Sequence, residues 1–304
     1  MFISIFKDEF NEFINYKKSL GYVYRKETIY WYDKLDKHFH KNNLNRKEIN
    51  KELYEKWLIK RENESNNTYA LRYTAMRQFC IYLINNKYEN IYYSDEYNIK
   101  YKKEFIPHIY TEDEIKKIFE LSTNVDLTFE VIIKLLYSTG LRISEVLNIE
   151  IDNVNLKNNQ IYIINGKNNV SRIIVMSDSM SDKLKEYINS KNYFDTKYLF
   201  SSKGNKYGYN KFKYNYKKIL SDLNINARIH DLRHTFAVNS LNQMVEKGYD
   251  VYTSLPLLSQ YMGHQRIEST EYYLRFIEKY YDDVTNAVNN YYGNIYPNLE
   301  VEYE

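Results

Sequence analysis

The chain has 304 residues, of which 43% are hydrophobic and 27% charged, so it is long enough for two folded domains and too hydrophobic for a disordered protein. Its one cysteine, Cys80, excludes an intrachain disulfide and a metal site built from cysteines, and it suits a reducing cytoplasm. No segment approaches the roughly 20 consecutive apolar residues that span a membrane, and the first residues do not read as a signal peptide. We therefore expect a cytoplasmic protein with no membrane partner. The formal net charge of +3 permits a nucleic-acid partner without requiring one.

Two segments near the start of the chain are patterned for amphipathic helices. In residues 6–22 and 66–86, apolar side chains recur every three or four positions. The residues expected to face inward in the second segment are Leu71, Ala75, Phe79 and Leu83. Arg72 and Arg77 are expected on its other faces, where they are candidates to reach a DNA groove. Exposed arginines without such a role explain the spacing equally well.

A charged, tyrosine-rich segment follows these helices and ends at Pro107, one of only three prolines. This change in composition marks a boundary between domains. We assign residues 1–94 to a helical domain, 95–106 to a linker and 107–304 to a second domain.

The second domain is patterned for helices with a small sheet. Thr111 and Glu114 form a capping-box pattern that starts one helix, and Gly140 is suited to end the next. Two runs rich in Ile and Val flank the polar turn 166–169, which predicts a β-hairpin. Further helices are expected over 178–190, 209–222, 230–245, 254–263 and 267–290. The predicted fold class is mainly α with a small antiparallel sheet.

Arg142 follows the expected helix end at Gly140 and starts another helix, with Glu145 three residues later. A cation at a helix start opposes the helix dipole, whereas a phosphate bound there is favoured by both the dipole and the arginine. Glu145 can orient the guanidinium group. A purely structural Arg–Glu pair is the alternative.

His230 and Arg233 are three residues apart on one expected helix, so their side chains can converge on an anion. Asp231 lies between them as a supporting candidate. His230 and His234 have a spacing that also suits a metal, but no cysteines or clustered carboxylates accompany them, so no metal or other cofactor is expected.

Two further groups of cations are candidates. Lys167 lies at the predicted hairpin tip, where it can deliver an ammonium group as a proton donor, although most turn lysines are simply solvated. Residues 196–221 contain seven lysines and no acid, interleaved with aromatic residues. The candidates for phosphate contact in this stretch are Lys203, Lys206, Lys211 and Lys213. A solvated helix face is the simpler alternative.

Tyr272 and Tyr273 are adjacent, and on a helix their side chains point about 100° apart. Both therefore cannot face one reacting group, and the spacing alone does not choose between them.

Taken together, these residues resemble a known family. The segments TGLRISEVL, HDLRHTFA and GHQRIESTEYYLR, with Arg142, a hairpin lysine, His230-x-x-Arg233, Gly263-His264 and a tyrosine nine residues later, resemble the tyrosine recombinase (phage integrase) family. The resemblance covers nearly the whole chain and is to compact two-domain integrases of the Xer and transposon-recombinase type. Asn168 and Met262 depart mildly from the family's pattern, where glycine and leucine are usual.

The resemblance implies a SAM-like, helical core-binding domain that binds DNA, followed by an α+β catalytic domain with a C-terminal tail. Arg142 and Arg233 would bind the scissile phosphate, and His230 and His264 would hydrogen-bond it or assist proton transfer. Lys167 would protonate the leaving 5′ oxygen, and Tyr273 would be the nucleophile. The expected partners are double-stranded DNA recombination sites, a homotetramer in the synaptic complex, and a second recombinase or accessory protein.

Several functions remain open on this resemblance. Integration or excision of a mobile element is expected, and Xer-like resolution of chromosome or plasmid dimers is the alternative. A type IB topoisomerase shares the chemistry, and a catalytically silent DNA-binding regulator could share the fold. The tail beyond Asn290 is expected either to dock on a neighbouring subunit or to be an acidic terminus without a partner.

Overall fold

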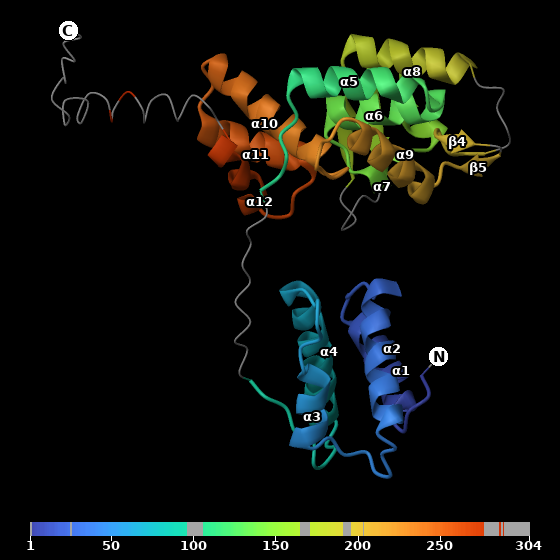
Figure 1. Cartoon of the computed structure of the whole chain (residues 1–304), viewed down its shortest axis with the longest axis vertical. Helices are drawn as coiled ribbons and strands as arrows, with labels where there is room; N and C mark the ends of the chain where they lie inside the picture. Colours follow the sequence, from blue (N-terminus) through green and yellow to red (C-terminus); the bar gives the residue numbers. More distant parts are fainter. Residues whose placement is uncertain are drawn as a thin grey trace, which may run out of the picture. The chain divides into compact units, whose positions relative to one another are not determined.

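The computed structural model describes residues 2–24, 26–95, 106–164, 171–190, 196–202 and 204–276, together with residues 286 and 288. The chain forms two compact units, Met1–Phe105 and Ile106–Glu304. The described residues are mostly helical (Figure 1). They also carry a three-stranded and a two-stranded antiparallel sheet. The predicted fold class is confirmed. None of the described helices is both long and apolar enough to cross a membrane.

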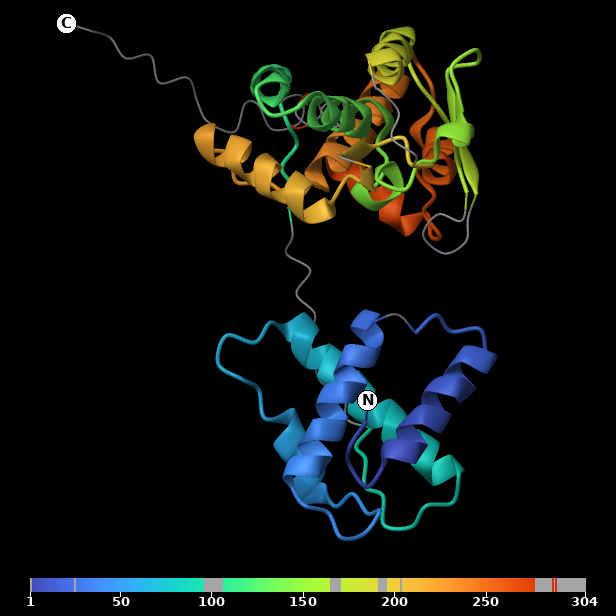
Figure 2. The ribbon, with the colours of Figure 1, turned by 90° about the vertical axis from the view of Figure 1, so that its right-hand side faces the viewer.

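The N-terminal unit consists of packed helices (Figure 2). Its core is rich in aromatic side chains. Its described helices are α1 (Lys7–Ser19), α2 (Lys26–Lys41), α3 (Lys51–Leu58) and α4 (Asn66–Asn85). Phe10 and Phe79 stack at the centre with ring centroids 3.9 Å apart. Because stacked aromatic rings bury large areas, this contact ties α1 to α4 across the unit.

The buried face of α4 differs from the predicted one. Leu71 is 52% exposed, whereas Arg72 and Met76 are buried. The prediction for Leu71 is wrong because it assumed that an arginine faces solvent, and the helix is rotated so that Arg72 points inward. The other three residues predicted to face inward, Ala75, Phe79 and Leu83, are buried as expected.

The C-terminal unit is built around α6 (Leu127–Thr139), which packs against α5 (Glu112–Thr123), α8 (Asp178–Ser190) and α10 (Asp231–Glu246) (Figure 1). Nearly every apolar side chain of α6 is buried, so this helix is the centre of the core. The remaining described helices are α7 (Ile143–Val146), η1 (Ile151–Asn153), α9 (Tyr209–Asp222), α11 (Val251–Met262), α12 (Glu268–Glu271) and η3 (Tyr272–Phe276).

The larger sheet has the order β1 (Val154–Asn155), β2 (Gln160–Ile163) and β3 (Arg172–Val175). The strands β2 and β3 pair antiparallel with Ile161 opposite Ile174, and both of these residues are buried. The two strands of the predicted hairpin are thus confirmed, whereas its tip with Lys167 lies outside the described residues. The smaller sheet pairs β4 (Ser201–Ser202) with β5 (Asn205–Lys206).

Local sequence signals fix where several helices of the C-terminal unit begin and end. The capping box of Thr111 and Glu114 is present at the start of α5, as predicted. Gly140 ends α6 in the left-handed region with φ of 62°, and a Cβ atom there would lie 2.3 Å from the ring of Phe236. Gly263 ends α11 with φ of 67°. Only glycine adopts such backbone angles readily, so these two positions set where the chain turns.

The end of the described chain departs from prediction. In place of a continuous α-helix from residue 267, one short α-helical turn, α12, is followed by the 3₁₀-helix η3. In this tighter helix Tyr273 joins an apolar cluster with residues of α10 and α11. Packing against those helices therefore outweighs the α-helical pattern of the sequence.

Candidate active site

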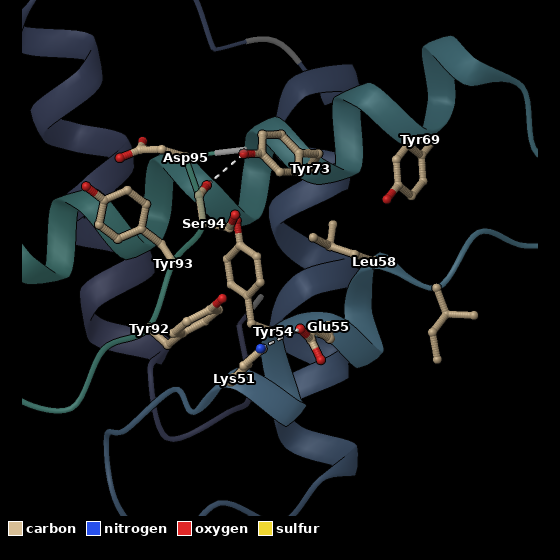
Figure 3. Close-up of a pocket in the computed structure, with 11 residues that line it drawn as sticks. Lys51, Tyr54, Glu55, Leu58, Tyr69, Tyr73, Tyr92, Tyr93, Ser94 and Asp95 are labelled. Carbon is tan, nitrogen blue, oxygen red and sulfur yellow. Dashed lines mark hydrogen bonds and ion pairs between the residues drawn. The ribbon is translucent and has the colours of Figure 1, made fainter. Parts of the chain in front are cut away.

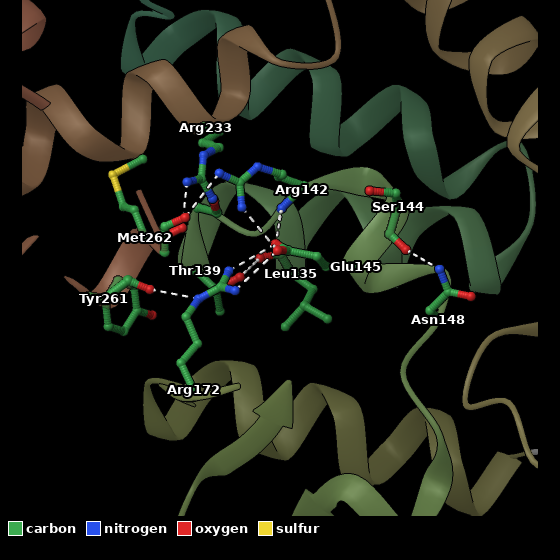
Figure 4. A network of polar contacts seen from close by, with 12 residues as sticks. Leu135, Thr139, Arg142, Ser144, Glu145, Asn148, Arg172, Arg233, Tyr261 and Met262 are labelled. Carbon is green, nitrogen blue, oxygen red and sulfur yellow. Dashed lines mark hydrogen bonds and ion pairs between the residues drawn. The ribbon is translucent and has the colours of Figure 1, made fainter. Parts of the chain in front are cut away.

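Glu145 is shared between two arginines at the centre of the C-terminal unit (Figure 4). Arg142 donates from Nη1 and from its backbone N–H to the two carboxylate oxygens of Glu145, each at 3.0 Å. Arg172 donates from Nη1 and Nη2 to the same two oxygens, at 3.0 and 2.9 Å. Burial opposes the charge on Glu145, but the hydrogen bonds from Arg172 and Arg142 outweigh it and hold the pKa of Glu145 below its ordinary value. Glu145 is therefore ionised and fixes both guanidinium groups.

Arg233, on α10, is held by backbone carbonyl groups. It is 2% exposed, and its Nη1 and Nη2 atoms donate to the carbonyls of Gly140 and Met262, each at 2.6 Å. Its Nε atom is buried and has no hydrogen-bond partner in the described part of the chain. Burial, and then the nearby charge of Arg142, lower the pKa of Arg233 to about 9, which leaves it charged at neutral pH.

These contacts gather an excess of positive charge. Arg142 also donates from Nη2 to the carbonyl of Gly263 at 3.3 Å, and Arg172 donates from Nε to the carbonyl of Tyr261 at 2.9 Å. Two largely buried guanidinium groups thus share the carboxylate of Glu145, and a third, that of Arg233, is bound nearby by backbone carbonyls alone. Guanidinium groups are suited to bind phosphate oxygens, so the arrangement has the chemistry to bind an anion.

Three histidines line the same region. Burial first, and then the positive charges around them, lower the pKa of His230 to about 3, of His264 to about 3 and of His234 to about 4. They are therefore neutral at pH 7. Nδ1 of His264 lies 2.8 Å from Oγ1 of Thr270, and the rings of His230 and His234 meet edge to face at 4.8 Å.

Tyr273 places its phenol among these groups. It is 2% exposed, its Oη atom lies 2.9 Å from Nδ1 of His234, and its ring stacks beside His264 with centroids 6.5 Å apart. Burial raises the pKa of Tyr273 to about 12, although Arg233 and Arg142 act to lower it. Tyr272 instead packs against the ring of Phe276, with centroids 5.7 Å apart, and under the guanidinium of Arg275 at 5.4 Å. Of the two adjacent tyrosines, Tyr273 is the one that contacts the histidines.

The remaining predicted residues of this unit have different surroundings. Asp231 is buried and accepts a hydrogen bond from the backbone N–H of Arg228 at 2.7 Å, so it fixes the turn that leads into α10. Lys206 bonds to the side chain of Asn148, and Lys211 pairs with Asp126 at 2.8 Å. The side chain of Lys213 is exposed. Lys167 and Lys203 lie outside the described residues.

The expectation that Arg72 reaches DNA is corrected by the structure. Arg72 is 1% exposed, its Nε donates to Glu64 at 2.7 Å, and its Nη1 donates to the carbonyl of Trp57. A buried guanidinium with these partners ties α4 to the end of α3 and cannot contact a phosphate. Arg77 remains partly exposed, pairing with Asp95 at 2.7 Å.

Arg172 is a residue of this site that sequence reasoning missed. It opens β3, where a charged residue beside a hairpin turn looks solvated. The sequence does carry one signal for such a residue. The prediction pairs Glu145 with Arg142 alone, whereas a carboxylate has two oxygens that can accept from two guanidinium groups.

A hollow of about 1000 Å³ in the N-terminal unit is a second candidate for a binding site (Figure 3). Its lining includes five tyrosines, Tyr54, Tyr69, Tyr73, Tyr92 and Tyr93. The one cation in the lining, Lys51, lies 3.7 Å from the carboxylate of Glu55, and Asp95 adds another negative charge. The hollow therefore lacks the excess of positive charge that distinguishes the site around Arg233.

The chain belongs to the phage integrase family, because the model of that family matches residues 108–279, more than half of the 304 residues. Among curated relatives, tyrosine recombinase XerA of Pyrococcus furiosus is 29% identical over 191 residues, which are 60% of this chain and 63% of XerA. The chain thus spans less than two thirds of the length of that relative.

Two solved structures show the same fold. The first is the XerH site-specific recombinase bound to a palindromic difH substrate, with a TM-score of 0.65 and 20% identity over 84% of this chain and 78% of XerH. The second is the integrase of transposon Tn1549 with a circular intermediate DNA, with a TM-score of 0.63 and 15% identity over 87% of this chain and 94% of the integrase.

Proposed function

We propose that this chain is a site-specific DNA recombinase that cuts and rejoins strands through a 3′-phosphotyrosyl intermediate. The observation that carries the proposal is the placement of the Tyr273 phenol near Arg233, which two backbone carbonyls hold, and near Arg142, which shares the carboxylate of Glu145 with Arg172. Membership of the phage integrase family supports the same chemistry.

In this reaction the oxygen of Tyr273 attacks the scissile phosphorus, the bond to the 5′ oxygen breaks, and a phosphotyrosine bond forms. The five-coordinate transition state carries more negative charge than the phosphodiester. Arg142 and Arg233 bind the non-bridging oxygens and stabilise that added charge, because preorganised cations in a site shielded from water act strongly. Lys167 protonates the 5′ oxygen, as it would by family resemblance. The phosphotyrosine bond conserves the energy of the phosphodiester, so a second strand can be joined without ATP.

The phenol needs its surroundings in order to react. With a pKa of about 12, Tyr273 is almost fully protonated at neutral pH. An anion bound by Arg142 and Arg233 would place the phosphorus next to the phenol, and the same cations would stabilise the phenolate that forms. His230 and His264, which are neutral, can donate a hydrogen bond to the phosphate from one ring nitrogen.

The remainder of the chain supplies DNA contacts in this proposal. The N-terminal unit acts as a core-binding domain that holds the duplex, with Arg77 as a phosphate contact, and Lys203, Lys206, Lys211 and Lys213 contact the backbone from the catalytic unit. Two protomers bind each recombination site and four form the synapse. A second recombinase or an accessory protein joins them where the reaction needs a direction.

Two biological roles agree with two different similarities, one of fold and one of sequence. Integration or excision of a mobile element agrees with the fold shared with the Tn1549 transposon integrase. Resolution of chromosome or plasmid dimers agrees with the sequence similarity to XerA. The DNA that flanks the gene separates the roles, because a mobile element carries its recombination sites at its own ends.

The test is trapping of the covalent intermediate. A binding sequence is first selected from a library of random duplexes and compared with the DNA flanking the gene. A nicked suicide duplex of that sequence should then capture the protein in a bond that survives denaturation. Tyr273→Phe should abolish capture, and Tyr272→Phe, the matched control, should retain it.

Three outcomes would count against the proposal. Capture by Tyr273→Phe would mean that another residue is the nucleophile. Specific binding without any capture by the unmodified protein would identify a silent DNA-binding regulator. Relaxation of supercoiled DNA without strand exchange between two sites would identify a type IB topoisomerase.

A further inference from the structure

His234 has no role in the reaction as described so far, yet it contacts the atom that reacts. It lies one turn after His230 on α10, and its Nδ1 atom is 2.9 Å from Oη of Tyr273. The two rings meet at a centroid distance of 5.6 Å. Tyr273 is 2% exposed, so its hydroxyl is shielded from bulk solvent, and in the tautomer of His234 that carries its proton on Nε2 the phenol donates to Nδ1.

The other two histidines are placed differently. Nδ1 of His264 is engaged by the hydroxyl of Thr270 at 2.8 Å, and its ring lies alongside the Tyr273 ring. His230 lies at the start of α10 and meets His234 edge to face. Both are therefore suited to a phosphate held by Arg233, whereas His234 is suited to the phenol.

We propose that His234 is a catalytic residue that removes the proton from Tyr273 during its attack on the phosphate, an inference that rests on the proposed recombinase function. The O–H bond of Tyr273 breaks and its proton binds to Nδ1 of His234. The phenol oxygen forms its bond to phosphorus, and the bond from phosphorus to the 5′ oxygen breaks, with the leaving oxygen taking a proton from a different donor. When the strand is rejoined, His234 returns the proton to the phenol.

The charges around His234 make this transfer depend on the bound DNA. Among the described residues, the ionisable groups facing it are Arg233 on α10, His230 and Arg228 before that helix, His264 after α11, and Tyr273 on η3. In the free protein, burial and the arginines lower the pKa of His234 to about 4, so it is neutral and unable to hold the proton. A phosphate bound between Arg142 and Arg233 adds negative charge, which favours protonated His234. Proton transfer is thus linked to occupation of the anion site.

Substitution of His234 by asparagine tests whether His234 acts as a base or only positions the phenol. In His234→Asn the side-chain oxygen occupies nearly the place of Nδ1, so it can accept the phenol hydrogen bond but cannot take the proton. Cleavage of the nicked suicide duplex should be slowed by about 100-fold or more in both His234→Asn and His234→Ala, as is typical for loss of a general base. DNA affinity measured with Tyr273→Phe as background should be unchanged by either substitution. If His234→Asn restores cleavage to the level of the unmodified enzyme, His234 only orients the phenol and the proposal fails.

The pH dependence gives a second readout. With His234 neutral and acting as the base, the cleavage rate of the unmodified enzyme should be nearly flat between pH 6 and 9. In His234→Asn, hydroxide from the solvent must deprotonate the Tyr273 phenol. The cleavage rate should then rise by about tenfold per pH unit in this range, which is below the pKa of the phenol. A tenfold rise per pH unit in the unmodified enzyme would overturn the proposal without any variant, and so applies even if both substitutions prevent folding.

A duplex with sulfur in place of the scissile 5′ oxygen gives the matched control, because a thiolate leaves without needing a proton. Lys167→Ala should cleave this duplex nearly as fast as the unmodified enzyme, whereas His234→Asn should remain slow. Recovery of His234→Asn on this duplex would assign His234 to the leaving group and overturn the proposal. Failure of the unmodified enzyme to form any covalent complex is a different result, which would contradict the proposed recombinase function itself.

Discussion

Arg172 and Glu145 form a bidentate ion pair between β3 and α7, with Nη1 to Oε1 at 3.0 Å and Nη2 to Oε2 at 2.9 Å. The side chains are 8% and 4% exposed. This pair fixes the carboxylate that in turn orients Arg142, so it connects the base of the hairpin to the anion site.

Arg172→Met should therefore destabilise the protein strongly. Removing Arg172 leaves the buried carboxylate of Glu145 with Arg142 as its remaining cationic partner. Loss of a partner from a buried ion pair costs up to about 3–5 kcal/mol in the free energy of unfolding. Urea unfolding of the full chain measures this change. The control is Lys197→Met, which removes an exposed partner of Glu150 and should leave the unfolding midpoint unchanged. Equal effects of the two substitutions would show that the Glu145 pair is not structural.

Arg233→Ala should lose cleavage and keep binding. One preorganised electrostatic donor contributes about 100–1000-fold to rate, whereas DNA affinity rests on many other phosphate contacts. Single-turnover cleavage and filter binding of the same suicide duplex measure the two quantities. A parallel fall in both would mean that Arg233 contributes to affinity and not to the transition state.

Gly140→Ala should displace Arg142. The new Cβ atom would lie 2.3 Å from Phe236, and φ at this position is +62°. Gly248→Ala is the matched control, because Gly248 also has a positive φ, +83°, but a Cβ atom added there would have no atom within 4 Å. The control should cost about 1–2 kcal/mol from backbone strain alone, and Gly140→Ala should cost more and also reduce cleavage. Equal losses of stability would show that the Phe236 ring moves aside freely.

Arg72 and Arg77 should behave oppositely although they share α4. Arg72→Met breaks a buried ion pair with Glu64 and should lower the unfolding midpoint, as followed by fluorescence of the neighbouring Trp57. Arg77→Met should leave stability nearly unchanged and should reduce the salt dependence of DNA binding by about one phosphate contact. Unchanged salt dependence would remove Arg77 from the proposed DNA surface.

Stability should decrease at acid pH because of the three histidines. Their pKa values in the folded protein, about 3 for His230 and His264 and about 4 for His234, are below the value of about 6.5 for an unfolded chain. The unfolded state therefore binds more protons as the pH falls, so stability is highest above pH 6.5 and is progressively lost toward pH 3–4. Urea unfolding at several pH values measures the slope, and His264→Asn should make it shallower. A slope unaffected by this substitution would show that His264 does not titrate with folding.

The sequence predicted the elements whose signals are local. The capping box at Thr111, the left-handed turn at Gly140 and the paired strands around residues 160–175 each depend on neighbouring residues, and each is present. The burial of Arg72 was not predictable in this way, because its partners Glu64 and Trp57 become adjacent only when α3 and α4 pack.

The same distinction applies to the site. Motif order pointed to Arg142, His230, Arg233, His264 and Tyr273, and the structure places them in one region. Motif order could not point to Arg172, whose partner Glu145 lies 27 residues earlier in the sequence. Nor could it point to the contact between His234 and Tyr273, which are 39 residues apart. Such contacts depend on the packing of β3 and η3 against the core and leave no spacing pattern.

The binding of Arg233 by backbone carbonyls has a consequence for how sequences of this kind diverge. Its two bonds go to the carbonyls of Gly140 and Met262, and a peptide carbonyl is present whatever amino acid occupies the position. The side chain at Met262 can therefore change during evolution without loosening the guanidinium. What selection must preserve is the path of the main chain, and that path is set by the ends of two helices.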